Sequence, residues 1–241
     1  MPKLSIIIPT YNEEGNIGTL INAVHNVLKS INTTHEIIIV DDNSQDRTRP
    51  LVKELQTKIP ELILIERNHE RGLASAMVAG YNAAKGELLG AMDADLAHDP
   101  NDLPTMLNLI DNNKADFVIG SRYVPGAKFE GKALLNKVAS LVGQTLIKIF
   151  LGLDIKDTSN NYRIFKRGLW EKIRKKLHPD GNVMLTEIVY LASKVNIKII
   201  EILIHYIERR AGKSKLSVFK ETLKFFKNIA KIRRGKQTID K

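Results

Sequence analysis

Short apolar runs rich in Ile, Leu and Val alternate with amphipathic helical patterns through the first half of the chain. Apolar runs without polar alternation are typical of parallel strands that are buried on both faces. The helical patterns between them supply the crossover connections that parallel strands need. The sequence therefore predicts an α/β domain with a mainly parallel, doubly wound sheet and helices on both of its faces.

The periodicity assigns strands and helices to most of the chain. We expect strands at 4–8, 36–40, 62–65, 87–92, 116–120 and 197–204, and helices at 16–29, 47–58, 73–84, 102–112, 133–151 and 183–194. A last helix is expected over 217–234, where an apolar stripe lies beside a stripe of lysines. Since no linker interrupts the pattern, we expect one domain over 1–213 and a basic amphipathic helix with a tail over 214–241.

Charge is unevenly distributed along the chain. Residues 1–125 hold 11 Lys and Arg against 17 Asp and Glu, and residues 126–241 hold 26 against 10, so the net charges are −6 and +16. The acidic half suits a cation, and the basic half suits an anion or an anionic surface. The absence of cysteine excludes disulfides and thiolate zinc sites. Neither a membrane-spanning apolar run nor a signal peptide is visible, so a cytoplasmic location is expected.

Polar side chains follow the predicted strands at their carboxyl ends. Ligands of open α/β sheets bind at this edge, where the ends of parallel strands meet. We therefore expect these side chains to share a cleft. The segments concerned are 9–13, 41–44, 93–95 and 121–123.

Asp93 and Asp95 are separated by a single small residue at a predicted strand end. An isolated pair of this kind is more often a solvated turn. At a strand end, however, both carboxylates can face one side and hold a hard divalent cation, Mg²⁺ or Mn²⁺, that also bridges nucleotide phosphates. No glycine-rich dinucleotide fingerprint follows the first strand and no P-loop is present, so phosphates must be met by a cation and by Arg or Lys.

Asp41 and Asp42 close the second predicted strand. One interpretation is a turn, in which Ser44 or Asp46 caps the following helix. The other is that the two carboxylates accept hydrogen bonds from a base or a ribose.

The strand-end segments together resemble family 2 glycosyltransferases with the GT-A fold, and the match runs over nearly the whole chain. The matching segments are 5–13 (SIIIPTYNE), 40–44 (VDDNS), 71–73 (RGL), 93–96 (DADL) and 120–123 (GSRY). The segment 209–216 (RRAGKSKL) is similar to the corresponding segment of dolichol-phosphate mannosyltransferases and related polyprenyl-phosphate glycosyltransferases. The resemblance implies an inverting transfer of a hexose, mannose or glucose, from GDP-mannose or UDP-glucose to a polyprenyl phosphate at a membrane surface.

The resemblance also implies roles for individual residues. Asp93 and Asp95 would hold the Mg²⁺ or Mn²⁺ ion, and Asp95, Arg122 and Arg209 would be the catalytic residues. The acceptor phosphate would be bound by Arg122, Arg209 and Lys215. The donor would be bound by Pro9, Tyr11, Glu13, Val40, Asp42, Asp93, Ala94, Asp95 and Arg122.

Three places depart from the family pattern. Ala97 replaces a glutamine that helps to coordinate the metal, so metal binding would be weaker, or would be completed by water, His98 or Asp99. For His98 and Asp99, however, a solvated turn and the cap of the next helix are the favoured roles. Asn136 replaces an arginine that contacts the acceptor phosphate. Residues 160–162 (NNY) replace Ser-Gly-Phe of the acceptor loop, whose turn is expected to survive because asparagine tolerates positive φ.

The acceptor determines which catalytic groups are needed. A phosphate monoester has its second pKa near 6, so a lipid phosphate is largely dianionic at neutral pH and needs no general base. A sugar hydroxyl of a glycan or glycolipid, the runner-up acceptor, would need one, and Asp99 and Glu187 are the candidates. A nucleotidyltransferase and a basic nucleic-acid-binding module are further alternatives; the acidic first half argues against nucleic acid as a partner.

Two helices are candidates for contact with a membrane. The basic helix at 217–234 could lie in the lipid interface, pack on the domain, or dock a membrane-protein subunit. The helix at 133–151 is either a second interfacial helix or a core helix. A peripheral protein on the cytosolic face of a membrane is the expected outcome.

Overall fold

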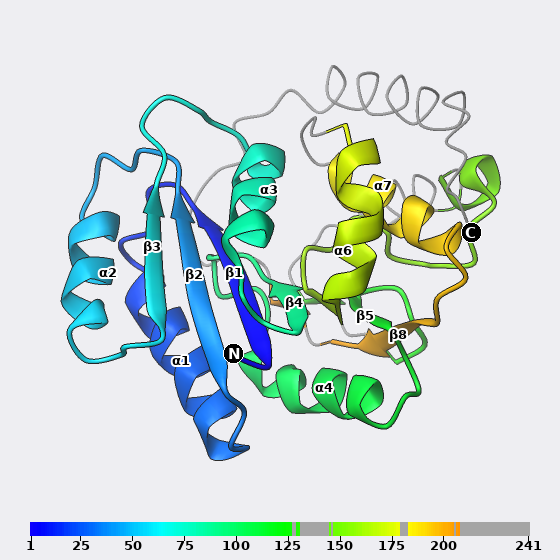
Figure 1. Cartoon of the computed structure of the whole chain (residues 1–241), viewed down its shortest axis with the longest axis horizontal. Helices are drawn as coiled ribbons and strands as arrows, with labels where there is room; N and C mark the ends of the chain where they lie inside the picture. Colours follow the sequence, from blue (N-terminus) through cyan, green and yellow to red (C-terminus); the bar gives the residue numbers. More distant parts are fainter. Residues whose placement is uncertain (127–128, 131–144, 146, 179–182, 205, 208–241) are drawn as a thin grey trace.

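The computed structural model describes residues 1–126, 129–130, 145, 147–178, 183–204 and 206–207 (Figure 1). Its strands are β1 (Leu4–Thr10), β2 (His35–Asp41), β3 (Leu62–Glu66), β4 (Leu88–Ala91), β5 (Phe117–Ser121), β6 (Phe129–Glu130), β7 (Arg163–Lys166), β8 (Ile199–Leu203) and β9 (Tyr206–Ile207). Its helices are α1 (Ile17–Ser30), α2 (Thr48–Gln56), α3 (Leu73–Ala83), α4 (Leu103–Asp111), α6 (Arg167–Ile173) and α7 (Val183–Ser193), with short 3-10 turns η1 (Pro100–Asp102) and η2 (Arg174–Lys176).

Seven strands form one sheet in the order β3-β2-β1-β4-β7-β5-β8 (Figure 1). β1 pairs in parallel with β2 and β4, β2 with β3, and β5 with β8. Only β7 runs antiparallel to its neighbours within this sheet, between β4 and β5. The expected α/β fold with a mainly parallel sheet is confirmed, and β6 and β9 form a separate parallel pair.

Apolar cores cover both faces of the sheet, because the side chains of each strand alternate between the two sides. In β1, Ile7 packs in a core with residues of α3, α6 and α7. Its neighbours Ile6 and Ile8 pack in a second core with residues of α1, α2 and α4. All three are fully buried, which accounts for the unbroken apolar run that predicts this strand.

The second half of the chain departs most from the sequence-based expectation. The pattern did not predict β7 and α6, since β7 has only four residues and begins with a charged one, Arg163. Of the helix expected at 133–151, residues 147–151 are helical and most of the rest lies outside the described residues. The helix expected at 217–234 lies outside them entirely, so the division at 213 stays a prediction. No helix in the described part of the chain is long and apolar enough to span a bilayer.

We expect Gly86→Ala to destabilise the sheet, because an added Cβ would lie 2.6 Å from the backbone nitrogen of Ser5 in β1. Overpacking of this kind costs about 1–3 kcal/mol, and a backbone atom cannot rotate away. Gly18→Ala in α1 is the control, since its Cβ would meet nothing within 4 Å and should stabilise the helix by about 0.5–1 kcal/mol. Urea unfolding of both variants tests this; equal midpoints would contradict it.

Candidate functional site

A cavity of about 670 Å³ opens at the carboxyl edge of the sheet. It brings together residues that follow β1, β4 and β5, as the parallel strand directions require. A cavity of about 730 Å³ at the opposite edge, around His25 and His35, lacks this convergence. The carboxyl-edge cavity is lined by Pro9, Tyr11, Glu13, Leu73, Asp93, Ala94, Asp95, Arg122, Ser159, Asn161 and Leu185.

Most of the residues expected at the donor site line this cavity, but two do not. Val40 is fully buried in the core between the sheet and α3. Asp42 lies nearby, where its Oδ2 accepts the backbone N–H of Gly72 at 2.7 Å and its Oδ1 lies 3.2 Å from Nη1 of Arg67. Burial raises the pKa of Asp42, while the Gly72 N–H and Arg67 act in the opposite direction. Arg209 and Lys215 lie outside the described residues.

The turn after β4 holds two carboxylates in place. Oδ1 of Asp95 accepts the backbone N–H of Ala97 at 3.1 Å, and Oδ1 of Asp93 accepts the side-chain amide of Asn161 at 3.0 Å. Between the acids and Ala97, Leu96 has φ of 62°, a left-handed conformation that a leucine rarely adopts. Such backbone strain is concentrated at functional sites, where surrounding structure enforces it.

The buried side chain of His98 contacts the same turn. Its Nδ1 accepts the backbone N–H of Asp93 at 3.2 Å, and its ring stacks on Tyr162 with centroids 5.0 Å apart. Burial lowers the pKa of His98, although Asp93 and Asp95 oppose this, so the imidazole is neutral at pH 7. The expectation of a solvated His98 is wrong, since only 1% of the residue is exposed. Asp99 is an exposed cap of η1, as expected, and accepts the backbone N–H of Asn101.

Arg122 is oriented by a buried carboxylate. Its Nε and Nη2 donate to Oδ2 and Oδ1 of Asp157 at 2.7 and 2.8 Å, and its backbone N–H donates to Oδ2 at 3.1 Å. Two parallel bonds of this kind fix a guanidinium in one plane. The backbone N–H of Asp157 donates in turn to Oε1 of Glu201 in β8. Arg122 therefore lines the cavity in a single orientation.

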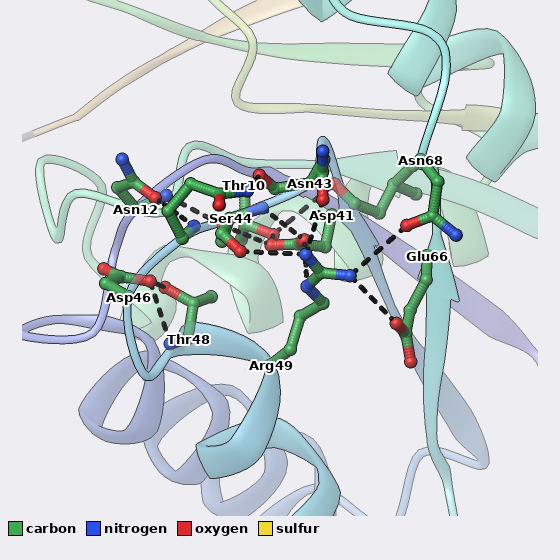
Figure 2. A network of polar contacts seen from close by, with 12 residues as sticks. Thr10, Asn12, Asp41, Asn43, Ser44, Asp46, Thr48, Arg49, Glu66 and Asn68 are labelled. Carbon is green, nitrogen blue, oxygen red and sulfur yellow. Dashed lines mark hydrogen bonds and ion pairs between the residues drawn. The ribbon is translucent and has the colours of Figure 1, made fainter.

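The turn after β2 has a structural role. Asp41 is fully buried, accepts the backbone N–H of Ser44 at 2.9 Å and lies 3.1 Å from Nε of Arg49. Figure 2 shows Arg49 at the centre of this network, joined also to Glu66 at the end of β3. Asp46 lies one residue before the N-cap position of α2, which is Arg47, and its Oδ1 accepts the backbone N–H of Thr48 at 3.0 Å. For Asp41, the turn interpretation is therefore confirmed.

An exposed aromatic ring lies at the rim of the cavity. Tyr11 is 47% exposed, and the guanidinium carbon of Arg71 lies 5.3 Å from the centroid of its ring. Arg71 and Gly72 belong to the loop that also contacts Asp42. The ring of Tyr11, with Asp42 nearby, offers a flat apolar face and an acceptor to a nucleobase.

Several residues of the site were not identified from the sequence. Asp157, Ser159 and Leu185 carried no recognisable motif, and Asn161 appeared only as a departure from a family pattern. Residues 157–161 reach the carboxyl edge of the sheet because β7 runs antiparallel, so its amino end lies where β4 and β5 end. Leu185 reaches the cavity from the first turn of α7. Neither Asn160 nor Asn161 has positive φ, so the loop at 160–162 does not use the left-handed conformation on which the expected turn was based.

The donor set fits a hard divalent cation that is shared with a ligand. The described residues contain no group of three or more His, Cys, Asp or Glu suited to holding a metal by themselves. Asp93 and Asp95 supply two carboxylates, and Ala97 supplies none. Mg²⁺ typically binds one or two carboxylates and completes its shell with water and substrate phosphates. The remaining space in the cavity could accommodate such phosphates beside Arg122.

Comparisons with known proteins agree with this geometry. Residues 5–174 match the family described as Glycosyl transferase family 2. The dolichol-phosphate mannosyltransferase of Pyrococcus furiosus is 36% identical over 99% of this chain, which spans 66% of that relative's length. The polyprenol monophosphomannose synthase of Mycolicibacterium smegmatis is 33% identical, over 88% of this chain and 80% of its own length.

A solved structure shares the fold. Glucosyl-3-phosphoglycerate synthase from Mycobacterium tuberculosis, in complex with Mn²⁺, UDP and phosphoglyceric acid, superposes with a TM-score of 0.70. The superposition covers 100% of this chain and 80% of that one, at 15% sequence identity. At this identity the likeness supports the fold alone.

Asp157→Asn should destabilise the protein, because an amide cannot accept two bonds from Arg122 without presenting a donor to it. We expect a loss of about 1.5–3 kcal/mol, the contribution of a hydrogen bond to a charged group. Asp154→Asn is the control, since Asp154 is almost fully exposed beside Lys148 and its loss should leave the denaturation midpoint unchanged. Equal shifts in the two variants would show that Asp157 does not hold Arg122.

Proposed function

Because the chain belongs to glycosyl transferase family 2, we propose that it is a glycosyltransferase that moves a hexose from a nucleotide sugar to a polyprenyl phosphate. The observation that carries this proposal is the convergence of Asp93, Asp95 and Arg122 on one cavity at the carboxyl edge of the sheet. The names of the two relatives support a polyprenyl phosphate acceptor and mannose as the sugar. Family membership favours an enzyme over the alternative of a basic nucleic-acid-binding module.

The donor would occupy the cavity with its base near Tyr11 and Asp42 and its phosphates near Arg122. Tyr11 provides a stacking face, and the carboxylate of Asp42 can accept a hydrogen bond from a base nitrogen or a ribose hydroxyl. Arg122 carries a fixed positive charge that can meet a phosphate oxygen. GDP-mannose and UDP-glucose are the two donors to test first.

Asp93 and Asp95 would hold Mg²⁺ or Mn²⁺, and the cation would neutralise the diphosphate as it leaves. Each carboxylate already accepts one fixed hydrogen bond, from Asn161 and from the backbone of Ala97. These bonds keep the carboxylates oriented before any ligand arrives, which lowers the reorganisation needed on binding.

The acceptor phosphate would attack the anomeric carbon of the hexose. A bond forms from the phosphate oxygen to that carbon while the bond from the carbon to the donor diphosphate breaks, with inversion at the carbon. The attacking oxygen is already ionised, so no proton has to be removed. The main obstacle is repulsion between the two anions, which Arg122 and the cation would offset.

The two proposed bases for a hydroxyl acceptor do not line the cavity. Asp99 caps η1, and the side chain of Glu187 is 1% exposed, with its carboxylate held by the backbone and ring of His178. Glu187 is thus a buried partner of His178. Neither of these two carboxylates is therefore placed to take a proton from an acceptor hydroxyl in this cavity.

Contact with the membrane would involve residues that the structure does not describe. Arg209 and Lys215 would bind the acceptor phosphate, and the basic segment over 214–241 would lie against anionic lipid or a membrane-protein subunit. Such an arrangement would place the chain on the cytosolic face, where nucleotide sugars meet the lipid.

Asp95→Asn should abolish Mg²⁺- or Mn²⁺-dependent binding of the nucleotide sugar, because an amide is a much weaker metal ligand than a carboxylate. Thermal shift with GDP-mannose and with UDP-glucose, each with either metal, measures this. A ligand at 100 times its dissociation constant stabilises the native state by about 2.7 kcal/mol. Asp111→Asn, which removes only an exposed partner of Lys3, is the control. Wild-type turnover in Asp95→Asn would defeat the proposal.

The acceptor is tested by comparing a polyprenyl phosphate with the polyprenol of the same length, both in detergent. Only the phosphate carries an ionised nucleophile, so we expect transfer to the phosphate and none to the alcohol. A radiolabelled donor and extraction into organic solvent give the measurement. Equal transfer to the two lipids would favour a hydroxyl acceptor and a base outside the described residues.

A further inference from the structure

Arg163 is fully buried at the start of β7, and in the described part of the chain its guanidinium donates hydrogen bonds to main-chain carbonyls and not to a carboxylate. A buried guanidinium is costly unless its donors are satisfied. Here they meet main-chain carbonyls: Nε and Nη2 donate to Asn160, Nη1 donates to Leu185 at 2.9 Å, and Nη2 also reaches Thr158 at 3.4 Å. Burial lowers the pKa of Arg163, but an arginine starts so far above neutrality that it stays charged.

The carbonyls that Arg163 contacts belong to the wall of the cavity. Thr158 and Asn160 alternate along the chain with Ser159 and Asn161, and the latter two line the cavity. Leu185, at the start of α7, lines it as well. One side chain therefore ties two separate segments of the wall together. The strand register explains how this is possible, since Arg163 pairs with Ala91 of β4 and with Ile119 of β5.

Residues 158–161 also contact the segments that carry Asp93 and Arg122. The Asn161 amide donates to Asp93 at 3.0 Å, and the Asn160 amide donates at 2.6 Å to the carbonyl of Gly120, two residues before Arg122. Asp157, just before the segment, holds the guanidinium of Arg122. Contacts thus run from Arg163 through Asn160 and Asn161 to both Asp93 and Arg122.

We propose that Arg163 is a positioning residue of the donor site, which anchors residues 158–161. Anchored in this way, Asn161 orients Asp93 for the cation, and Asn160 holds the backbone carbonyl of Gly120, two residues before Arg122. The inference rests on the proposed function, because it takes Asp93 as a metal ligand. It assigns a positioning role to Arg163 and Asn161, which act through Asp93 and Arg122. The guanidinium acts through its geometry, since three carbonyls in different directions need its fork of donors.

The first test is a double-mutant cycle between Arg163→Met and Asn161→Ala. Its readout is the Mn²⁺ concentration that half-saturates binding of GDP or UDP, by calorimetry well below the unfolding midpoint of each variant. We expect each single change to raise this concentration about tenfold, as loss of a residue that orients a metal ligand does. The double variant should also show about a tenfold rise, because one residue acts through the other. A hundredfold, additive rise would overturn the proposal.

Arg167→Met is the matched control. Arg167 also donates to two main-chain carbonyls, those of Gly86 at 2.7 Å and Ala84 at 2.9 Å, but at the opposite end of β7. Its loss should destabilise the protein and leave the half-saturating Mn²⁺ concentration unchanged within about twofold, as for a distant independent site. A similar rise in Arg167→Met would show that Arg163 is merely structural. If Arg163→Met does not fold, Arg163→Lys replaces it in the cycle and should still raise the concentration, because lysine lacks the fork.

Amide hydrogen exchange in the metal-free protein tests the anchor without any ligand. Arg163→Met should speed exchange at Tyr162, whose N–H donates to Oδ1 of Asn160, and at Arg122, whose N–H donates to Asp157. Wild-type exchange rates at both positions would overturn the inference. Failure of the wild-type chain to bind either nucleotide would instead defeat the proposed function, so the two failures are distinguishable.

Discussion

The antiparallel insertion of β7 between β4 and β5 is the constraint on which the rest of the site depends. In an entirely parallel sheet, this edge would carry only residues that follow strands. Because β7 runs the other way, the residues before it, Asp157 to Tyr162, meet the residues after β4 and β5. The carboxylates of Asp93 and Asp95 and the guanidinium of Arg122 are thus surrounded by polar groups that belong to the middle of the chain.

Preorganisation is the common feature of these contacts. Asp93 is oriented by Asn161, Asp95 by the backbone of Ala97, and Arg122 by Asp157. An ion or phosphate that enters such a site finds its partners in position, so less of the interaction energy is lost in ordering side chains. The left-handed Leu96 shows that the fold tolerates local strain to keep the turn in this shape.

Much of the fold could be predicted from periodicity, because strands buried on both faces and helices buried on one leave clear patterns. The segments after β1, β4 and β5 could be picked out as site residues because parallel strands end at a common edge. The interpretation of Asp41 and Asp42 was harder, because a carboxylate that closes a turn and one that faces a ligand look alike in sequence. The structure separates them: Asp41 bonds Ser44 and Arg49, whereas Asp42 lies beside Arg67 and Gly72.

By itself, the sequence determined the α/β class, the family and the acidic turn at Asp93 and Asp95, since each is encoded in a local pattern or motif. Only the tertiary structure decided the role of β7 and of the residues around it. A four-residue strand has no periodicity of its own, and the burial of Arg163 depends on carbonyls of Thr158, Asn160 and Leu185 brought together by folding. The hydrogen bond from Arg163 to Leu185 leaves no trace in residue spacing, because it joins positions 22 residues apart that are adjacent only in space.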